Sequence, residues 1–179
     1  MVEPLFLIAV TVIALLVLTI YWIISRRNRF VAMSNLVAES WRQVDVELRR
    51  RYDLIPNLVR VVEGYAQYER ATLEALTAAR SAVTSAHALP QRAMAEDGLG
   101  QTVRMALVQA EAYPVLQANQ QFLALQHELV ETEDRIAAGR RLYNGNVRAY
   151  NTALQTFPSS LIGSMMQLQP AEYFQGQGR

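Results

Sequence analysis

The sequence contains no cysteine and no lysine, and no glycine occurs before residue 64. Without cysteine the chain can form no disulfide, no thiolate metal site and no cysteine nucleophile. Its basic side chains are all arginine, and they nearly balance the acidic ones to leave a formal net charge of +1. A chain this close to neutral has no field that would attract nucleic acid, so nucleic-acid binding is not expected.

The motifs of common enzymes are also missing. The sequence has neither a glycine-rich phosphate loop nor a Gly-x-Ser-x-Gly motif. The segment from His127 to Glu131 resembles the zinc-binding helix of proteases, but glutamate replaces the second histidine ligand. A di-iron helix would need glutamate at position 124, which is alanine. We therefore expect no catalytic residue, cofactor, metal or small-molecule substrate. A hydrolase with an unrecognised site at His127 or Glu131 is the remaining enzymatic alternative.

A long apolar run predicts a membrane anchor over residues 5–25, after a short tail at residues 1–4. Leu5 to Ile24 carry no charge, and about 20 apolar residues can span a hydrocarbon core of about 30 Å. A cleaved signal peptide is the alternative, but its positive charge would precede the apolar run, whereas here the arginines follow it. The residues expected at the membrane interface are Tyr21, Trp22, Arg26, Arg27 and Arg29.

The arginines after the anchor predict its orientation. By the positive-inside rule, the N-terminus lies outside the cell membrane and the following domain lies in the cytoplasm. The same arginines can bind anionic lipid headgroups, at about 1 kcal/mol each, or can serve only to set topology. Membrane lipids are thus the first expected partner.

Apolar residues at intervals of three and four predict a helical domain over residues 26–158. The first stripe indicates one helix from about residue 28 to about residue 84. Within it, Pro56 should cause a kink or a one-turn break, because it cannot donate a hydrogen bond to the carbonyl of Tyr52. A carbonyl freed in this way could also face a ligand. The stripe consists of Val37, Trp41, Val44, Leu48, Ile55, Leu58, Val62, Tyr65 and Leu76.

The second half of the chain predicts a loop and then more helix. Pro90, Gly98 and Gly100 indicate a loop over residues 86–100. Pro114 either begins the next helix or kinks a continuous one. A short helix between these points should bury Val103, Leu107 and Ala110. A second stripe, ended by Phe157-Pro158, consists of Phe122, Leu125, Leu129, Ile136, Tyr143, Val147, Tyr150 and Leu154.

Two apolar stripes on one chain bury each other best as antiparallel helices with coiled-coil-like packing. We therefore predict an all-α fold, in which an N-terminal transmembrane helix precedes an elongated antiparallel helical bundle with long kinked helices. The C-terminal tail, residues 159–179, carries apolar side chains that could dock on the bundle, on a partner or on the membrane. Docking on the bundle is the preferred interpretation.

The run Arg49-Arg50-Arg51 is the most basic part of the predicted domain. Asp45 and Glu47 stand four residues before Arg49 and Arg51, a spacing that favours ion pairs on a solvated helix face. The alternative is a site for an acidic lipid headgroup or an acidic partner. The candidate interaction residues around this run and the predicted kink are Arg49, Arg50, Arg51, Asp53 and Asn57.

A dipeptide repeat supplies a second set of candidates. Tyr143-Asn144 recurs as Tyr150-Asn151 after seven residues, two turns along the same predicted helix. The structural interpretation places the tyrosines in the seam between helices and the asparagines beside it, as polar contacts that set the register. The functional alternative is a ladder that docks a peptide.

The sequence resembles the LemA family of bacterial membrane proteins over nearly its whole length. The blocks that carry the resemblance are Ser40-Trp41, VDVELRRRYDLIPNLV (44–59), Gly64-Tyr65-Ala66, EAYPVLQANQQFLALQHEL (111–129), TEDRIAAGRRLYNGNVRAYNTALQTFP (132–158) and Tyr173-Phe174. Three positions depart from the family pattern, because Glu63 replaces a lysine, Tyr68 a histidine and Gly139 an alanine. Gly139 should weaken its helix by about 1 kcal/mol, and any chemistry of the family's histidine would be absent.

The resemblance implies a bundle of long kinked helices behind an N-terminal anchor and brings no established activity. Members of the family are discussed beside membrane proteases of the HtpX type, beside TPM-domain proteins and in the building of internal membrane compartments. These associations suggest a protein partner or self-association. We therefore expect a non-enzymatic, single-pass scaffold or adaptor. A self-assembling protein that shapes the membrane is the alternative from a different class.

Overall fold

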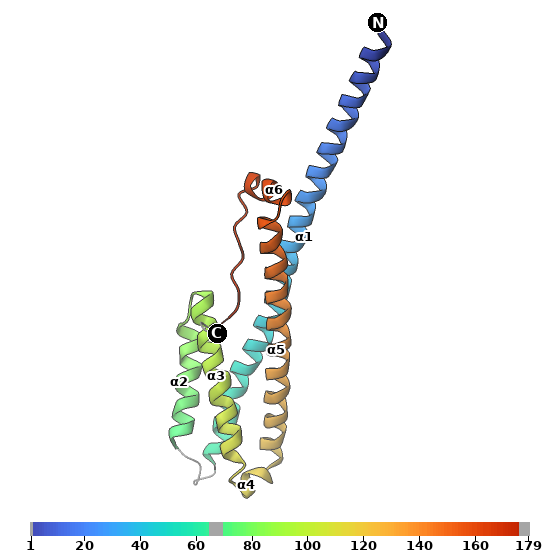
Figure 1. The fold of residues 1–179 in the computed structure, drawn as a ribbon. Helices are drawn as coiled ribbons and strands as arrows, with labels where there is room; N and C mark the ends of the chain where they lie inside the picture. Colours follow the sequence, from blue (N-terminus) through green and yellow to red (C-terminus); the bar gives the residue numbers. More distant parts are fainter. Residues whose placement is uncertain (1, 65–69, 176–179) are drawn as a thin grey trace. The chain divides into compact units, whose positions relative to one another are not determined.

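A computed structural model describes residues 2–64 and 70–175, and these residues form helices and connecting turns without a strand. The prediction of an all-α bundle with one long apolar N-terminal helix is thus confirmed. The six helices are α1 (Val2–Glu63), α2 (Arg70–Ser85), α3 (Leu89–Ala110), α4 (Pro114–Gln117), α5 (Gln120–Gln155) and α6 (Ser159–Met165) (Figure 1).

Helix α1 is a single helix of 62 residues that contains the whole predicted anchor. Its apolar N-terminal part is long and apolar enough to cross a membrane, and the side chains from Phe6 to Ile20 are exposed. The hydroxyl groups of Thr11 and Thr19 donate to carbonyls one turn earlier, so neither is left without a partner. A helix with its polar groups satisfied internally meets the requirement of a lipid environment.

Pro56 lies inside α1, so of the two outcomes expected at this proline, a kink or a one-turn break, the break does not occur. The proline cannot bond to the carbonyl of Tyr52. That carbonyl instead accepts a hydrogen bond from Nε of Arg80 in α2, at 3.4 Å. The Arg80 guanidinium also lies over the Tyr52 ring, 3.9 Å from its centre. A side chain of the same protein thus replaces the lost backbone donor, which is the role that the sequence analysis left open for a ligand.

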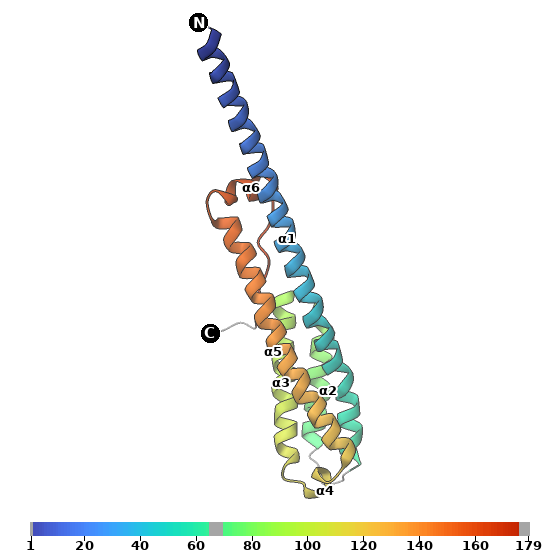
Figure 2. The ribbon, with the colours of Figure 1, turned by 90° about the vertical axis from the view of Figure 1, so that its right-hand side faces the viewer.

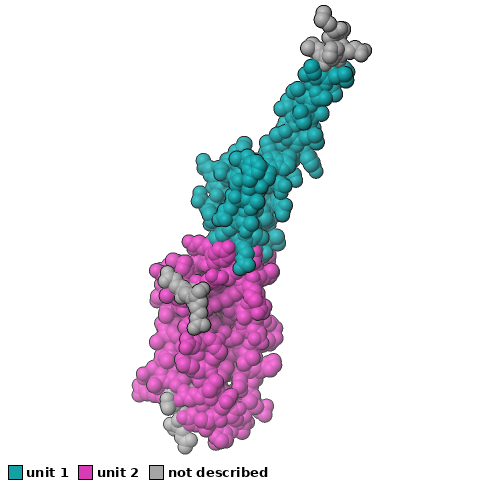
Figure 3. All heavy atoms as spheres, viewed as in Figure 1, with its two compact units in different colours: residues 1–38, 146–171 teal, residues 39–145, 172–179 magenta. Residues whose placement is uncertain are grey.

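The chain forms two compact units (Figure 3). Unit 1 consists of residues 1–38 and 146–171, and unit 2 consists of residues 39–145 and 172–179. Helices α1 and α5 therefore contribute residues to both units. The predicted boundaries between tail, anchor, bundle and C-terminal tail remain predictions, because the compact units divide the chain on a different basis.

Unit 2 is a four-helix arrangement in which α1, α2, α3 and α5 alternate in direction (Figures 1 and 2). Burial of apolar side chains between these helices contributes about 25 cal/mol to stability for each Å² of apolar surface removed from water. The predicted stripes face inward, apart from Tyr65, which lies outside the described residues. The core consists of Leu54, Ile55, Leu58, Val62, Leu76, Leu99, Val103, Ala106, Leu107, Ala110, Leu116, Phe122 and Leu129.

Two predictions about helix boundaries are wrong. The helix expected over residues 28–84 is divided, since α1 ends at Glu63 and α2 begins at Arg70. The loop expected over residues 86–100 is mostly helix, because α3 begins at Leu89. Pro90 occupies the first turn of α3, where a missing N–H costs nothing. A separate short helix begins at Pro114, and the side-chain oxygen of Asn119 caps α5 by accepting from the N–H of Phe122 at 3.1 Å.

Unit 1 has a small core of its own, in which the C-terminal tail packs on α1 and α5. Phe30, Tyr150 and Ile162 are buried there, and the Phe30 and Tyr150 rings meet edge to face at 6.3 Å. Gly163 brings α6 close to α5, because a Cβ at this position would lie 2.8 Å from a methyl group of Leu154. The partly buried residues packed against this core are Trp22, Ile23, Met33, Val37, Ala153, Leu154, Met166, Leu168 and Ala171.

Candidate functional site

The predicted arginine run contains a buried ion cluster in unit 2. Arg51 is 1% exposed and bridges α1 to α3 and α5. One of its terminal nitrogens donates to the carboxylate and, at 2.9 Å, to the backbone carbonyl of Glu96. The other donates to the carboxylate of Glu133 at 2.6 Å. A buried guanidinium is stable only when such partners replace its water shell.

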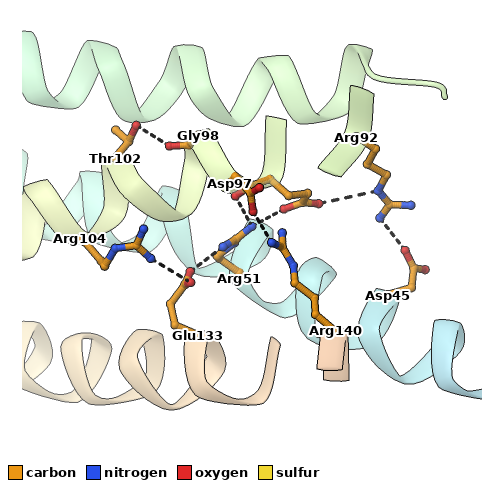
Figure 4. A network of polar contacts seen from close by, with 10 residues as sticks. Asp45, Arg51, Arg92, Asp97, Gly98, Thr102, Arg104, Glu133 and Arg140 are labelled. Atoms are coloured by element: carbon orange, nitrogen blue, oxygen red, sulfur yellow. Dashed lines mark hydrogen bonds and ion pairs between the residues drawn. The ribbon is translucent and has the colours of Figure 1, made fainter. Parts of the chain in front are cut away.

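Further ion pairs surround this cluster (Figure 4). Arg92 reaches Asp45 at 2.6 Å, and Arg104 lies 3.7 Å from Glu133. Arg140 pairs with Asp97. Around the buried guanidinium the charges balance, with three arginines set against three carboxylates: Arg51, Arg104 and Arg140 against Glu96, Asp97 and Glu133. Such a cluster holds helices in register and offers no excess charge to a ligand.

The individual arginines of the run have different surroundings, which periodicity alone did not distinguish. The predicted pair of Arg49 with Asp45 is present at 2.8 Å, on an exposed side chain. The predicted pair of Arg51 with Glu47 is wrong, because Arg51 turns inward and Glu47 lies 3.6 Å from Arg135. Arg50 crosses to α5 and donates to Glu128 at 2.8 Å.

The other two candidates near Pro56 are on the surface. Asp53 and Asn57 are both exposed, and neither joins the ion cluster. The structure therefore does not gather the first group of candidates into one site. Arg51 is a buried structural residue, whereas Arg49, Asp53 and Asn57 are accessible side chains on α1.

Gly100 makes room for the buried cluster. A Cβ at this position would lie 2.8 Å from Nη1 of Arg51 and 3.2 Å from a Glu133 oxygen. Gly98, two residues earlier in α3, has open space where a Cβ would be. The two glycines that predicted a loop therefore have different roles inside α3.

This contrast gives a matched prediction. Gly98→Ala should stabilise the protein by about 0.5–1 kcal/mol, because alanine is the better helix former. Gly100→Ala should destabilise it by about 1–3 kcal/mol, because the methyl group crowds the Arg51 guanidinium. Urea unfolding of the full chain in detergent, followed by circular dichroism, measures both. Equal shifts in the same direction would show that Gly100 has no packing role.

The tyrosine–asparagine repeat holds the chain's own C-terminal tail. In unit 1, Asn151 accepts from the N–H of Ala171 at 2.8 Å and donates to its carbonyl at 2.9 Å. In unit 2, Asn144 makes the same pair of bonds to Phe174, at 2.9 and 3.2 Å. Each carboxamide thus pairs with an extended backbone as a neighbouring strand would. The tyrosines are buried, as the structural interpretation expected, and the docked peptide is the chain's own tail.

Phe174 is the aromatic end of this docked segment. Its ring is 1% exposed and meets the Trp41 ring edge to face at 5.1 Å. The guanidinium of Arg140 covers it at 4.6 Å. The Tyr143 hydroxyl donates to the carbonyl of Glu172 at 2.8 Å. Burial, and then the nearby Glu172 carboxylate, raise the pKa of Tyr143 above its usual value, so this donor stays protonated at neutral pH.

The predicted interface residues lie at the end of the apolar part of α1. Tyr21, Arg27 and Arg29 are exposed, whereas Trp22 and Arg26 are partly buried. The Arg26 guanidinium lies 5.7 Å from the centre of the Trp22 ring. No carboxylate of the described chain forms an ion pair with any of these three arginines.

The enzymatic alternative finds no assembled site in the described part of the chain. His127 is exposed, and Glu131 pairs with Arg135 one turn later at 2.5 Å. Within residues 2–64 and 70–175, no group of three histidine, aspartate or glutamate side chains is placed to hold a metal ion. His127 and Glu131 therefore lie on the outer side of α5, whereas Leu129 between them is buried in the core.

Residues 40–179, which include all of the ion cluster and the tail-docking contacts, match the family model described as the LemA family. The chain belongs to the LemA family. This membership confirms the resemblance drawn from the sequence blocks. In the described part of this LemA-family chain, the matched blocks supply both Arg51 and the two asparagines that bind the tail.

Curated relatives are similar to the chain over most of its length. The magnetosome proteins MamQ 1 and MamQ 2 of Paramagnetospirillum magneticum are each 26% identical over 86% of this chain. The alignment covers 66%, just under two thirds, of their own length. The magnetosome protein MamQ of Magnetospirillum gryphiswaldense is 24% identical over 94% of this chain and 71% of its own. Protein LemA of Metamycoplasma hominis is 24% identical over 85% of this chain and 70% of its own.

The sequence analysis did not identify the two carboxylates that pair with Arg51. Glu96 lies in the segment predicted to be a loop, and Glu133 comes from a different helix than Arg51. Their signal was available, because Ala93, Glu96, Leu99 and Val103 recur at helical spacing after Pro90. An acidic residue on that stripe predicts a buried carboxylate that needs a cation.

Proposed function

We propose that this LemA-family chain is a non-catalytic scaffold or adaptor, anchored in the cell membrane by the apolar part of α1. The observation that carries the proposal is the continuity of α1, which runs as one helix from the candidate membrane span to Glu63 and supplies one helix of unit 2. A helical unit connected to its membrane anchor by one continuous helix suits a protein that holds a partner near a membrane. We place unit 2 on the cytoplasmic side, because the arginines follow the span.

The charge distribution of unit 2 supports this function. The buried arginine is balanced by Glu96 and Glu133, and Arg50 pairs across helices with Glu128. Ion pairs of this kind favour one packing of the helices over others. A unit held in one arrangement presents a constant surface to a partner.

Exposed apolar side chains on α3 offer a surface for such a partner. Met105 and Val108 lie one turn apart, and each is more than half exposed. Side chains three residues apart share a helix face. A helix face with two adjacent apolar side chains is suited to a helical partner or to a second copy of the chain.

The proposal is tested by photo-crosslinking in cells. A photoreactive amino acid is placed at Met105 or at Val108 of the full-length protein, and at exposed Thr77 on α2 as the control. Crosslinked products are purified in mild detergent and identified by mass spectrometry. One envelope protein captured from α3 but not from α2 supports the adaptor. Capture of copies alone supports a self-assembling, membrane-shaping protein instead, and no product from α3 contradicts both.

Arg50 provides a prediction for the same assay. Charge reversal by Arg50→Glu should lower the crosslink yield about fivefold, since we propose that the partner also contacts this charged side chain on α1. The reversal also breaks the contact with Glu128. The exchanged pair, Arg50→Glu with Glu128→Arg, restores that contact. The crosslink yield should stay low in the exchanged pair, because position 50, which the partner is proposed to contact, still carries a negative charge. Full recovery would show that Arg50 only supports the fold.

A further inference from the structure

The C-terminal helix of unit 1 lies beside the end of the candidate membrane span. Trp22 and Ile23, at the end of the apolar run, pack against the core that contains Ile162. Met166 belongs to the same packed group. Tryptophan at the end of a span prefers the headgroup region. If α1 spans the membrane, α6 is therefore at the depth of the headgroups.

The outer face of this segment is apolar. Leu161 and Met165 are four residues apart in α6, so they share a face, and they are 59% and 76% exposed. Phe157, just before the helix, is 76% exposed. Three large apolar side chains exposed at headgroup depth match the boundary between headgroups and acyl chains.

A basic hollow of about 320 Å³ adjoins this apolar face within unit 1. Its lining includes Arg26 and Arg29 from α1, Thr152 and Thr156 from α5, and Phe157. No acidic residue is among the described residues that line it. The hollow beside Arg51 differs in this respect, because Glu96, Asp97 and Glu133 line it and balance its arginines. Of these two hollows, the one in unit 1 has arginines in its described lining without a carboxylate beside them.

We propose that the hollow of unit 1 binds the phosphate of an anionic phospholipid. Arg26 and Arg29 supply charge and guanidinium donors for the phosphate oxygens. Phe157, Leu161 and Met165 contact the upper acyl chains of the same lipid. The proposal rests on the membrane anchoring of α1 proposed above, and it adds a defined lipid site to that anchor. The occupant is a lipid and not a free anion, because the apolar face adjoins the two cations.

The sequence supplies a matched control for this site. Arg27 lies between the two proposed ligands and carries the same charge, but it does not line the hollow. A loose band of positive charge would use all three arginines equally. In a site formed by specific side chains, substitution of Arg26 and Arg29 would reduce lipid binding, and substitution of Arg27 would not.

Trp22 reports on the site, because the Arg26 guanidinium covers its ring. The sequence has two tryptophans, so the change Trp41→Phe leaves Trp22 as the only source of tryptophan fluorescence. Full-length protein with this change is reconstituted in nanodiscs that contain brominated phosphatidylglycerol or brominated phosphatidylcholine, either of which quenches nearby tryptophan. Preferential quenching by phosphatidylglycerol measures enrichment of the anionic lipid beside Trp22. Native mass spectrometry of the protein in mild detergent counts the lipids that stay bound.

Phosphatidylglycerol should be enriched, and the double variant Arg26→Gln with Arg29→Gln should reduce its binding about tenfold, as expected for the loss of two cations near a membrane surface. Arg27→Gln should leave the enrichment unchanged. An equal loss in Arg27→Gln, or equal quenching by the two lipids, would overturn the site. Displacement of the lipid by inorganic phosphate would show a site for a free anion instead. Extraction of the protein from membranes by alkaline carbonate would contradict the anchor itself, which is a separate failure.

Discussion

Replacing Arg51 with methionine should destabilise unit 2 by about 3–5 kcal/mol, because the change leaves the carboxylate of Glu96 buried without its cation. Glu96 is 1% exposed and takes its main charge partner from α1. Methionine keeps only the aliphatic stem, so the loss reports removal of the whole guanidinium group with its charge and its hydrogen bonds. Urea unfolding of the full-length protein in detergent, followed by circular dichroism, gives the free energy.

Two variants separate the buried charge from other effects. Arg49→Met removes the neighbouring arginine, whose side chain is 77% exposed, and should leave the unfolding midpoint unchanged. Arg51→Met combined with Glu96→Leu should recover a large part of the loss, because an apolar pair needs no desolvated charge. A single Arg51→Met variant as stable as Arg49→Met would show that the buried pairs contribute nothing to the fold.

The second large effect is expected at Phe174. The change Phe174→Ala should weaken docking of the C-terminal tail by about 3 kcal/mol, which raises the undocked population about a hundredfold. The ring is buried against Trp41 and under Arg140, so all of these contacts are lost together. The tail can leave without unfolding the helices, so the change should appear locally.

Hydrogen exchange followed by mass spectrometry measures this local opening. The amides of Ala171 and residue 174 are protected by Asn151 and Asn144, and both should exchange faster in the variant. Circular dichroism should stay that of a helical protein. Tyr173→Ala is the control, because Tyr173 is 37% exposed and should cost little. Unchanged protection in Phe174→Ala would mean that the asparagines alone hold the tail.

Periodicity predicted the helices that bury an unbroken apolar stripe. Leu129, Ile136 and Val147 are buried as expected, because a three-four spacing places them on one face of α5 whatever the details of the fold. The same method failed over residues 89–100. Gly98 and Gly100 weaken a helix in isolation, but the close approach of Arg51 requires the small residue at 100. Tertiary packing around residue 100 therefore outweighed the local preference of glycine for loops.

The candidate sites show a similar limit. Spacing alone paired Arg51 with Glu47, because i, i+4 partners are visible in a sequence. The actual partners, Glu96 and Glu133, come from α3 and α5, and their proximity depends on how the helices pack. The repeat of asparagines was recognised, but the tail that they bind could not be identified, since each amide pairs with a backbone. A hydrogen bond to a backbone group does not depend on the residue type of the partner, so the sequence does not reveal it.

The position of the docked tail has a consequence for the order in which the protein is made. Chains are synthesised from the N-terminus, so Trp41, Tyr143 and Asn144 are all in place before Phe174 leaves the ribosome. Until then the Trp41 ring, which packs against Tyr143, lacks the Phe174 ring that meets it edge to face. A chain released too early would keep this aromatic surface open. Packing of Phe174 therefore distinguishes a chain that extends past this residue from one truncated before it, through a surface that chaperones and proteases are able to recognise.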